Sequence, residues 1–468
     1  MTSSSQAPCF VPEARILSLG DNFYDRVVAA DFPATILRFR NDRAAAEVGL
    51  ADLSDAEWID RFGRFRPLEG SLPEPLALRY HGHQFRVYNP DIGDGRGFLY
   101  AQLRDSRGRL MDLGTKGSGQ TPWSRFGDGR LTLKGGVREV LATEMLEALG
   151  VNTSRSFSLI ETGEALHRGD EPSPTRSSVL VRLSHGHIRI GTFQRLVTLG
   201  DVEGLEALTR YCLTELYGEE PGTSPALRLF ELVVERTARL AASYMAAGFV
   251  HGVLNSDNIA ITAESFDYGP WRFTPLWDPG FTAAYFDQMG LYAFGRQAQA
   301  IHWDVAQFGS SLTPLAPVEA LAPILDRFPA TYERALAAAM LARLGVAPRG
   351  EEADIALSDA MARALRQCTV TIDRFFFDWR GGARRGPSPD DAAYDHPVFR
   401  PFVEAVGGYQ PTTTIDHPYW SDPAPCAMPI EEVEAIWASI AESDDWSRFG
   451  TKIADIRRMS AALTIAQP

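Results

Sequence analysis

The stretch HGVLNSDN (residues 251–258) sets a histidine, a glycine, two asparagines and an aspartate close together. It follows residues 226–247, where Phe230, Val234 and Ala241 recur on one side at helical spacing. Gly248 then ends the predicted helix, since glycine suits the position after a helix terminus. The predicted helix therefore leads the chain directly into a short polar loop.

The loop is close to a kinase catalytic loop but departs from it at one position. In many small-molecule kinases it reads His-Gly-Asp, four further residues and Asn; the Asp accepts the substrate proton and the Asn holds a metal ion. Here Asn258 stands at that spacing, but Val253 takes the place of the Asp, and Asp257 stands beside the Asn. The sequence thus leaves two alternatives, an inactive kinase or one that performs different chemistry.

Further features occur in the order typical of kinases. The turn GDGRG (93–97) lets backbone N–H groups approach phosphate oxygens. Lys116 ends a predicted strand, and Glu139 on the following helix is its predicted partner, because an unpaired buried carboxylate is costly. Asn258 and Asp267, which opens DYG, offer a carbonyl and a carboxylate oxygen to Mg²⁺. Each feature alone is compatible with a surface turn or a solvated side chain; together they predict a kinase-like fold.

Arginines gather around the presumed phosphate site. Arg182 and Arg189 flank LSHGHI, and RFGDGR (125–130) supplies a second Gly-Asp-Gly-Arg. One arginine near a strand usually lies at a solvated edge, but arginine also binds phosphate in a bidentate manner. Several of them predict a deep, strongly cationic pocket.

Two histidine pairs raise the question of a zinc site. His81 with His83, and His185 with His187, could each place two imidazoles on one side of a strand. No cysteine lies near either pair. Structural hydrogen bonding is therefore favoured over zinc.

The order of elements predicts an α+β, protein-kinase-like two-lobed fold, with a small β-rich N-lobe and a larger helical C-lobe. We expect strands at 98–104 and 110–116 joined by a turn at 106–108, a helix at 136–149, a strand at 177–184, helices from about 196, a strand pair within 259–281 and a mobile loop at 380–391. The predicted division is an irregular N-terminal extension packed on the fold (1–75), the N-lobe with the phosphate site (76–195), the C-lobe with the catalytic loop and DYG (196–345) and a helical C-terminal extension (346–468).

Charge and composition argue against several classes of protein. The net charge of −14 over 468 residues disfavours nucleic-acid or anionic-membrane binding. The cysteines lie far apart without a CxxC pair, which argues against a disulfide scaffold and fits a reducing compartment. The beginning MTSSSQAPCF has no secretory pattern, and no segment is apolar over the length of a membrane span. We therefore expect a cytoplasmic protein.

Motifs between about residues 78 and 300 resemble those of the selenoprotein O family of pseudokinases. The similar stretches are YHGHQF, GDGRG, LGTKGSGQTPWSRFGDGR, REVLATEML, VLVRLSHGHIRIGTF, GFVHGVLNSDNIAI, FDYGPW and WDPGF, in one continuous order. The resemblance implies a kinase fold that transfers AMP from ATP to protein hydroxyls. It also implies that the nucleotide lies in the reverse of the ordinary kinase orientation.

The resemblance implies a role for each matching residue. Asp257 would be the general base, and Asn258 and Asp267 would hold Mg²⁺, with Mn²⁺ an open alternative. Glu139 would position Lys116. ATP would be bound by Gly93, Gly95, Arg96, Lys116, Asp128, Gly129, Arg182, Arg189 and Asp267. The aspartate at position 253 would be lost because γ-phosphoryl transfer is not the reaction.

The chain also departs from the family. Many bacterial members have a cysteine just after DPGF that can pair with one near the C-terminus. Here Ala283 stands near that place, and the ending TIAQP contains no cysteine. Redox gating by such a disulfide is therefore not expected. Beyond about residue 350 no motif is recognised.

Two main functions follow as hypotheses. The first is a metal-dependent protein adenylyltransferase, with ATP and hydroxyl-bearing proteins as partners and pyrophosphate as product. The second is a non-catalytic nucleotide-binding regulator, which Val253 favours and the retained Asn258 and Asp267 disfavour. An ordinary small-molecule kinase is a weaker third alternative. Target protein, modified residue, ATP or UTP preference and oligomeric state stay open.

Overall fold

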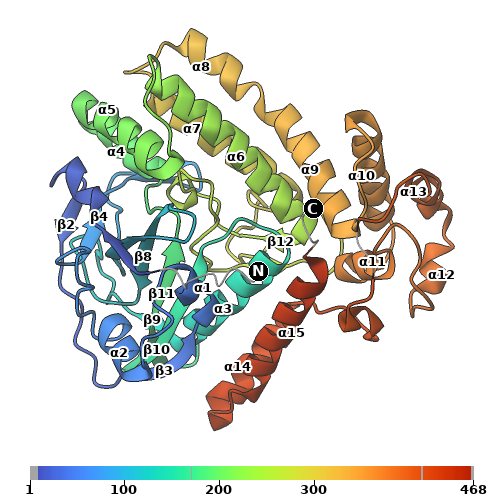
Figure 1. The fold of residues 1–468 in the computed structure, drawn as a ribbon, viewed down its shortest axis with the longest axis horizontal. Helices are drawn as coiled ribbons and strands as arrows, with labels where there is room; N and C mark the ends of the chain where they lie inside the picture. Colours follow the sequence, from blue (N-terminus) through green and yellow to red (C-terminus); the bar gives the residue numbers. More distant parts are fainter. Residues whose placement is uncertain (1–8, 170, 413–414, 465–468) are drawn as a thin grey trace, which may run out of the picture.

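One antiparallel sheet occupies the first part of the chain. The structure, a computed structural model, describes residues 9–169, 171–412 and 415–464. Within them the sheet follows the order β2-β4-β7-β8-β11-β10-β3, with β1 paired to β7 and β9 to β11 (Figure 1). Its strands are β1 (Val11–Glu13), β2 (Tyr24–Arg26), β3 (Ile36–Arg40), β4 (Leu76–Leu78), β7 (Leu99–Arg104), β8 (Leu110–Lys116), β9 (Leu131–Thr132), β10 (Arg155–Leu166) and β11 (Thr175–Ser184).

The centre of this sheet agrees with the sequence prediction. β7 and β8 form the expected hairpin, and Gly108 in its turn has a φ of +75°. Helix α3 (Leu133–Ala148) begins after Thr132, whose hydroxyl accepts the Gly135 N–H. Gly150, one residue beyond the C-cap, has a φ of +79°, as predicted for that position.

Residues 9–75 contain regular elements that pair with the main sheet, whereas the sequence predicted an irregular segment. Strands β1, β2 and β3 pair with β7, β4 and β10 of the main sheet. Helices α1 (Asp42–Glu47) and α2 (Asp55–Phe62) follow, and Trp58 stacks on Phe157 of β10 at a ring-centroid distance of 4.8 Å. The prediction of an irregular segment was wrong. These strands are short and are defined by hydrogen bonds to distant strands, so the local sequence carries no signal for them.

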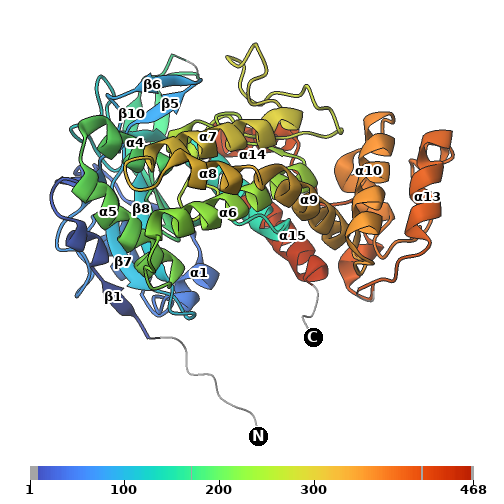
Figure 2. The same cartoon turned by 90° about the horizontal axis from the view of Figure 1, so that it is seen from above.

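Helical structure begins slightly before residue 196, where the sequence predicted it. Helix α4 begins at Ile190, because Ile190, Phe193 and Leu196 are all fully buried along one side. Figure 2 shows α6 and the surrounding helices beside the sheet. The helices of this lobe are α4 (Ile190–Leu199), α5 (Val202–Tyr211), α6 (Pro225–Ala247), α7 (Gln297–Ser311), α8 (Val318–Leu325) and α9 (Phe328–Leu344).

The strand pair predicted within residues 259–281 does not form. Instead β12 (Phe249–Val250) pairs with β13 (Arg272–Phe273). Asp267 has a φ of +65°, so the backbone of FDYGPW cannot continue as a β-strand through this residue. Pro275 and Pro279 each lack the N–H that a strand ladder needs. Residues 259–281 therefore form mostly loops.

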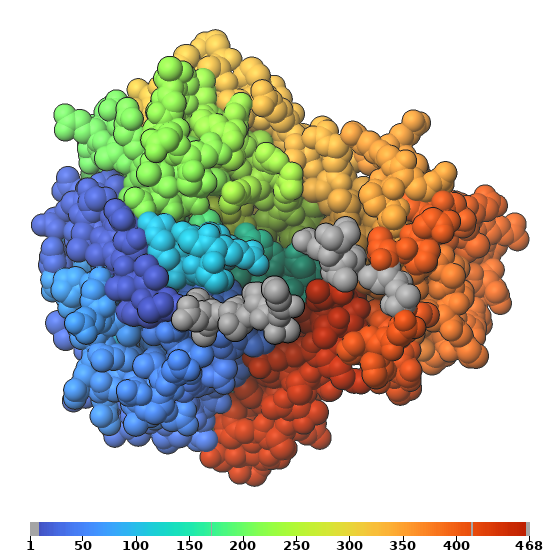
Figure 3. All heavy atoms as spheres, in the orientation of Figure 1, coloured from blue at the N-terminus to red at the C-terminus, as the bar shows by residue number. Residues whose placement is uncertain are grey.

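The C-terminal part contains two helical groups (Figures 1 and 3). The first, around a separate apolar cluster, contains α10 (Glu351–Arg366), α11 (Ile372–Asp378), α12 (Asp391–Tyr394) and α13 (Arg400–Val406). The second, α14 (Ile430–Ser443) and α15 (Ser447–Leu463), returns to pack on α3. None of the helices in the described ranges combines the length and hydropathy that a membrane span requires.

The predicted loop at 380–391 is present, with its last residue opening α12, and it is anchored at its beginning. The Arg380 guanidinium donates to the carbonyl oxygens of Ala342 and Arg343, each at 2.8 Å. Arg385 donates to the carbonyl of Trp420. Taken together, the β-rich first lobe, the larger helical lobe and the kinase-type order of strand lysine, helix glutamate, loop and DYG confirm the predicted fold class.

Candidate active site

A cavity of about 750 Å³ opens between the sheet and the loop that contains Asp257. It is lined by backbone of both Gly-Asp-Gly-Arg stretches and by mostly polar side chains. Of the residues singled out from the sequence, the cavity wall contains Gly93, Gly95, Arg96, Lys116, Asp128, Gly129, Arg182, Arg189, Asp257 and Asp267. Glu139 and Asn258 are not among the lining residues.

Lys116 connects the sheet to α3. Its ammonium nitrogen lies 2.5 Å from Glu139 Oε2 and 2.8 Å from Asp267 Oδ1. The Lys116 and Glu139 side chains are 6% and 2% exposed. Each compensates the charge of the other, which would be costly to bury alone. Glu139 thus lies behind Lys116 and fixes the ammonium group at the cavity wall.

Two buried arginines face the same cavity with unused donors. Arg182 Nη1 lies 3.7 Å from both Glu139 and Asp267, beyond hydrogen-bond distance. Arg189 donates to Asp94 Oδ1 at 3.2 Å and to the Asp257 carbonyl at 3.0 Å. Arg182 Nε and Nη1 and Arg189 Nε have no hydrogen-bond partner among the described residues. Buried guanidinium donors are normally satisfied, so these atoms indicate a site for an anionic ligand.

Asp267 is the carboxylate at the centre of this positive group. Burial alone would raise its pKa, but Lys116, Arg182 and Arg189 outweigh burial and hold the pKa well below the usual value. Its left-handed backbone is uncommon for a residue other than glycine and is typical of functional sites. Asp267 is therefore ionised at neutral pH.

Asp257 has the opposite electrostatic character. It belongs to a short 3-10 turn, Ser256–Asn258, and its Oδ1 is buried with no hydrogen-bond partner among the described residues. Burial raises the pKa of Asp257 to about 6, although Arg189 acts in the other direction. Gly82 passes so close that a Cβ there would lie 2.8 Å from the Asp257 side chain. A carboxyl group with a pKa near neutrality is suited to accept a proton.

Asn258 lies one residue further along the same turn. Its Nδ2 donates to the Val253 carbonyl at 2.9 Å, which leaves its Oδ1 as the atom available to a cation. The described residues contain no group of three or more His, Cys, Asp or Glu side chains arranged for a metal ion. Asp267 and Asn258 offer one carboxylate and one amide oxygen, which are of the ligand type that Mg²⁺ takes alongside phosphate oxygens.

The two Gly-Asp-Gly-Arg stretches meet through Trp123 and Ser124. A Cβ on Gly93 would lie 2.5 Å from Trp123 Cγ, so only glycine permits this approach. The Ser124 hydroxyl donates to the Gly95 carbonyl. In the second stretch, burial raises the pKa of Asp128, but the ion pair with Arg168 and other contacts lower it below its usual value overall.

Sequence reasoning missed several members of the site. Asp94 accepts the Leu78 N–H at 3.0 Å and pairs with Arg189, so it links the glycine-rich turn to the helical lobe. The sequence signal that could have identified Asp94 was its position between Gly93 and Gly95 in the glycine-rich turn. Tyr80 and Trp123 also line the cavity, and no spacing rule identified them.

Of the four histidines in the two pairs, three form the predicted hydrogen bonds through their rings, and the buried His185 Nε2 has no partner among the described residues. His81 Nδ1 lies 2.6 Å from the Tyr88 hydroxyl, and His83 Nδ1 lies 2.8 Å from Gln194 Nε2. His187 Nδ1 lies 3.2 Å from the Ser184 hydroxyl. These contacts account for three of the four imidazoles.

Comparisons with known proteins give one consistent result. The family model described as "Protein adenylyltransferase SelO" matches residues 10–391. A Synechocystis protein is 42% identical over 95% of this chain and 97% of its own length, and a Gloeobacter violaceus protein is 44% identical over 95% of both chains. A Synechococcus elongatus protein is 52% identical over 71% of this chain and 68% of its own. All three have the name "Protein nucleotidyltransferase YdiU".

A likeness to a solved structure is much weaker. The kinase domain of a Toxoplasma gondii rhoptry antigen aligns over 55% of this chain and 75% of its own at 10% identity, with a TM-score of 0.27. This likeness is too low to bear on fold or function.

Proposed function

This chain belongs to the SelO family, and from that premise we propose that it is a protein adenylyltransferase. It transfers AMP from ATP to a Ser, Thr or Tyr hydroxyl of another protein and releases pyrophosphate. The observation that carries the proposal is the pair of buried arginines, Arg182 and Arg189, whose unfilled donors face the cavity beside Lys116. A triphosphate supplies the anionic oxygens that these donors lack.

The proposed roles follow from the geometry and charge of each group. Lys116, held by Glu139, binds phosphate together with Arg182 and Arg189. Amides of the glycine-rich turns complete the ATP site, which contains Gly93, Gly95, Arg96, Asp128 and Gly129. Asp267 and Asn258 hold Mg²⁺ or Mn²⁺, which neutralises phosphate charge when bound.

Asp257 acts as the general base in this proposal. It takes the proton of the acceptor hydroxyl as that oxygen forms a bond to the α-phosphorus. The bond between the α-phosphorus and the oxygen that leads to the β-phosphate breaks, and pyrophosphate leaves. Positioning and electrostatic stabilisation by the arginines and Lys116 supply most of the rate enhancement. Val253 does not impede this chemistry, because Asp257 already lies at the cavity wall.

Labelled ATP tests the proposal directly. We expect label on the protein substrate, or on the enzyme itself, from ATP labelled at the α-phosphate and none from ATP labelled at the γ-phosphate. Transfer of the γ label alone would indicate an ordinary kinase. Intact ATP binding without transfer of either label would instead support a nucleotide-binding regulator.

A further inference from the structure

We propose that the C-terminal helix pair α14–α15 is a positioning element for the active site, acting through Arg457 on α3. This inference deepens the proposed function, because it concerns the position of Glu139 relative to Lys116. The helix pair lies beyond residue 391, where the match to the family model ends. No sequence motif assigned it a role.

Helix α3 is held against the sheet on one side. A Cβ on Gly136 would lie 2.4 Å from the Leu159 side chain and 2.8 Å from the Ser178 hydroxyl, so the helix packs closely on β10 and β11. Arg138, next to Glu139, donates to the Trp271 carbonyl at 3.1 Å. Trp271 follows the DYG segment, so α3 is also tied to the loop that contains Asp267.

Another side of α3 is in contact with α14 and α15. Their buried apolar residues belong to the same core cluster as the buried residues of α3. The members from the helix pair are Val433, Ile436, Ile440, Phe449, Ile453, Ile456, Met459 and Ala462. Without the pair, α3 would present this apolar surface to water and lose the contacts that hold its long axis in place.

Ion pairs fix both ends of α3 to the helix pair. Near the start of α3, Lys134 Nζ lies 2.7 Å from Glu434 Oε2 of α14. Near its end, Arg457 of α15 donates from Nε to Glu144 Oε2 at 2.9 Å and from Nη2 to Oε1 at 2.8 Å. A bidentate pair constrains orientation as well as distance.

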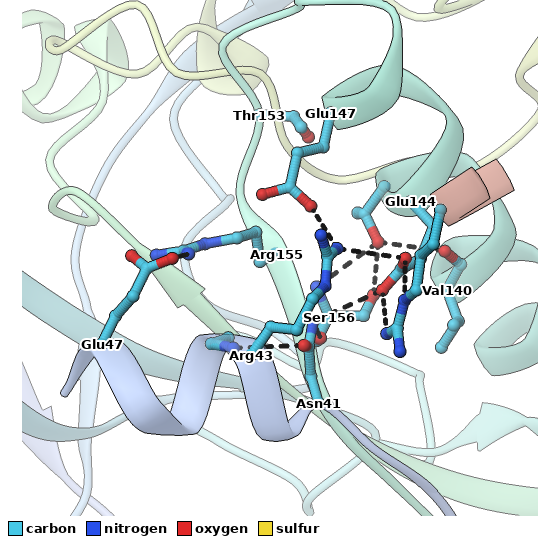
Figure 4. Close-up of polar contacts among 12 residues, drawn as sticks. Asn41, Arg43, Glu47, Val140, Glu144, Glu147, Thr153, Arg155 and Ser156 are labelled. Carbon is cyan, nitrogen blue, oxygen red and sulfur yellow. Dashed lines mark hydrogen bonds and ion pairs between the residues drawn. The ribbon is translucent and has the colours of Figure 1, made fainter. Parts of the chain in front are cut away.

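Glu144 is the member of this group whose burial requires a partner. Its side chain is only 2% exposed. Figure 4 shows it with Asn41 and Arg43; Arg43 Nη2 lies 3.3 Å from Glu144 Oε2, and Asn41 Nδ2 lies 3.5 Å from Oε1. These contacts are longer than those of Arg457. Loss of Arg457 therefore leaves a buried carboxylate poorly compensated, and α3 shifts to reach solvent or another partner.

A shift of α3 acts on the active site through Glu139. Lys116 is shared between Glu139 at 2.5 Å and Asp267 at 2.8 Å. When Glu139 withdraws, Lys116 pairs with Asp267 alone, and both groups become less available to phosphate and metal. Arg457 is thus a positioning residue that influences ATP binding without touching ATP.

The test compares neighbouring arginines of α15. We expect Arg457→Ala to raise the KM for ATP and to lower AMP transfer by roughly 2- to 30-fold, the range typical of residues that couple distant sites. Arg458→Ala is the matched control, because Arg458 pairs with Asp422 and not with α3. Arg457→Lys keeps the charge but not the bidentate geometry and should recover part of the activity. Equal activity of Arg457→Ala and Arg458→Ala would overturn the inference.

A second experiment, in an enzyme that already contains Glu139→Gln, separates a positioning role of Arg457 from a general loss of structure. In a Glu139→Gln enzyme, Arg457→Ala should cause no further loss, because residues that act through one another are not additive. A full additional loss would show that Arg457 acts by another route, and the inference would be wrong. If Arg457→Ala does not fold, Arg457→Lys is compared in both backgrounds instead.

A measurement of nucleotide binding tests this inference independently of the proposed function. If the unmodified enzyme transfers no AMP, the proposed function fails, and affinity for a fluorescent ATP analogue becomes the readout. Weaker binding by Arg457→Ala, with unchanged binding by Arg458→Ala, would still support the positioning role. Unchanged binding by both variants would overturn it.

Discussion

At the scale of single residues, Asp257 and Asp267 have opposite electrostatic environments although both line one cavity. Lys116, Arg182 and Arg189 surround Asp267, whereas Asp257 is buried with one oxygen unpaired. Carboxylates whose pKa values are separated in this way commonly divide the work of charge stabilisation and proton transfer. The same contrast underlies the division of roles in the proposed mechanism.

Asp257→Ala should lower turnover by about 10²- to 10⁴-fold, as expected for loss of a positioned base, and should change ATP affinity little. Because burial raises the pKa of Asp257 to about 6, kcat/KM of the unmodified enzyme should rise with pH through that value as the base loses its proton. The pH–rate profile of the Asp257→Asn enzyme should lose this rise. Recovery of near-normal turnover by Asp257→Ala at high Mg²⁺ would instead show that Asp257 only orients Asn258.

Glu264 gives a prediction about stability, which should decrease as pH rises, whereas the activity predicted above increases with pH. It accepts the His185 N–H at 2.8 Å, and burial raises its pKa from 4.5 to about 7. Between these values the folded protein binds a proton that the unfolded chain releases, so this contribution to stability falls as pH rises from about 4.5 to 7. Glu264→Gln keeps the acceptor and removes the titration.

The variant should therefore be more stable than the unmodified protein at pH 8, by roughly 1–3 kcal/mol, and the gain should vanish near pH 4.5. Chemical denaturation at several pH values measures it. Glu206→Gln, on the exposed side of α5, is the control for loss of one carboxylate. A gain that is equal at all pH values would contradict the role of burial.

At the scale of elements, the site depends on the contact between β8 and α3. Lys116→Ala should cost more activity than Glu139→Ala, because in the proposed site Lys116 binds phosphate directly and Glu139 only positions Lys116. The double variant should be little worse than Lys116→Ala alone. AMP-transfer rates of the two single variants and the double variant measure this coupling, and fully additive losses would show that the two residues act separately.

At the scale of the whole molecule, no disulfide forms among the described residues, and all four cysteines are free. Cys9 is exposed, and burial raises the pKa of Cys426 to about 11, which makes that thiol a poor nucleophile. Activity and thermal stability should therefore be the same with and without a reductant. The Cys9→Ser variant controls for intermolecular coupling of the exposed thiol. A loss of activity on mild oxidation that persists in that variant would contradict this prediction.

The four-segment division of the chain stays a prediction at this scale. Residues 9–75 supply three strands of the main sheet, and α14–α15 packs on α3 of the β-rich lobe. Both flanking segments therefore contribute to the structure of the β-rich lobe. Separate expression of residues 76–345 would test whether these segments can be removed.

The sequence by itself determined the elements whose signals are local. The β7–β8 hairpin, α3 and α6 follow from apolar periodicity and from glycines at their ends. The Lys116–Glu139 pair and the order of the motifs also follow from it, because a buried carboxylate needs a partner and because the motifs resemble one family.

Tertiary structure alone decided the contacts between distant residues. The partner of Arg189 at Asp94 lies 95 residues away, and the partner of Glu144 at Arg457 lies 313 residues away. β12 pairs with β13 across a gap of more than twenty residues, and Asp267 within that gap adopts a left-handed backbone conformation that no local sequence signal predicts. Spacing rules describe neighbours along one helix or strand, whereas burial brings together side chains from separate elements, and their charges then have to be satisfied by whatever groups the fold places beside them.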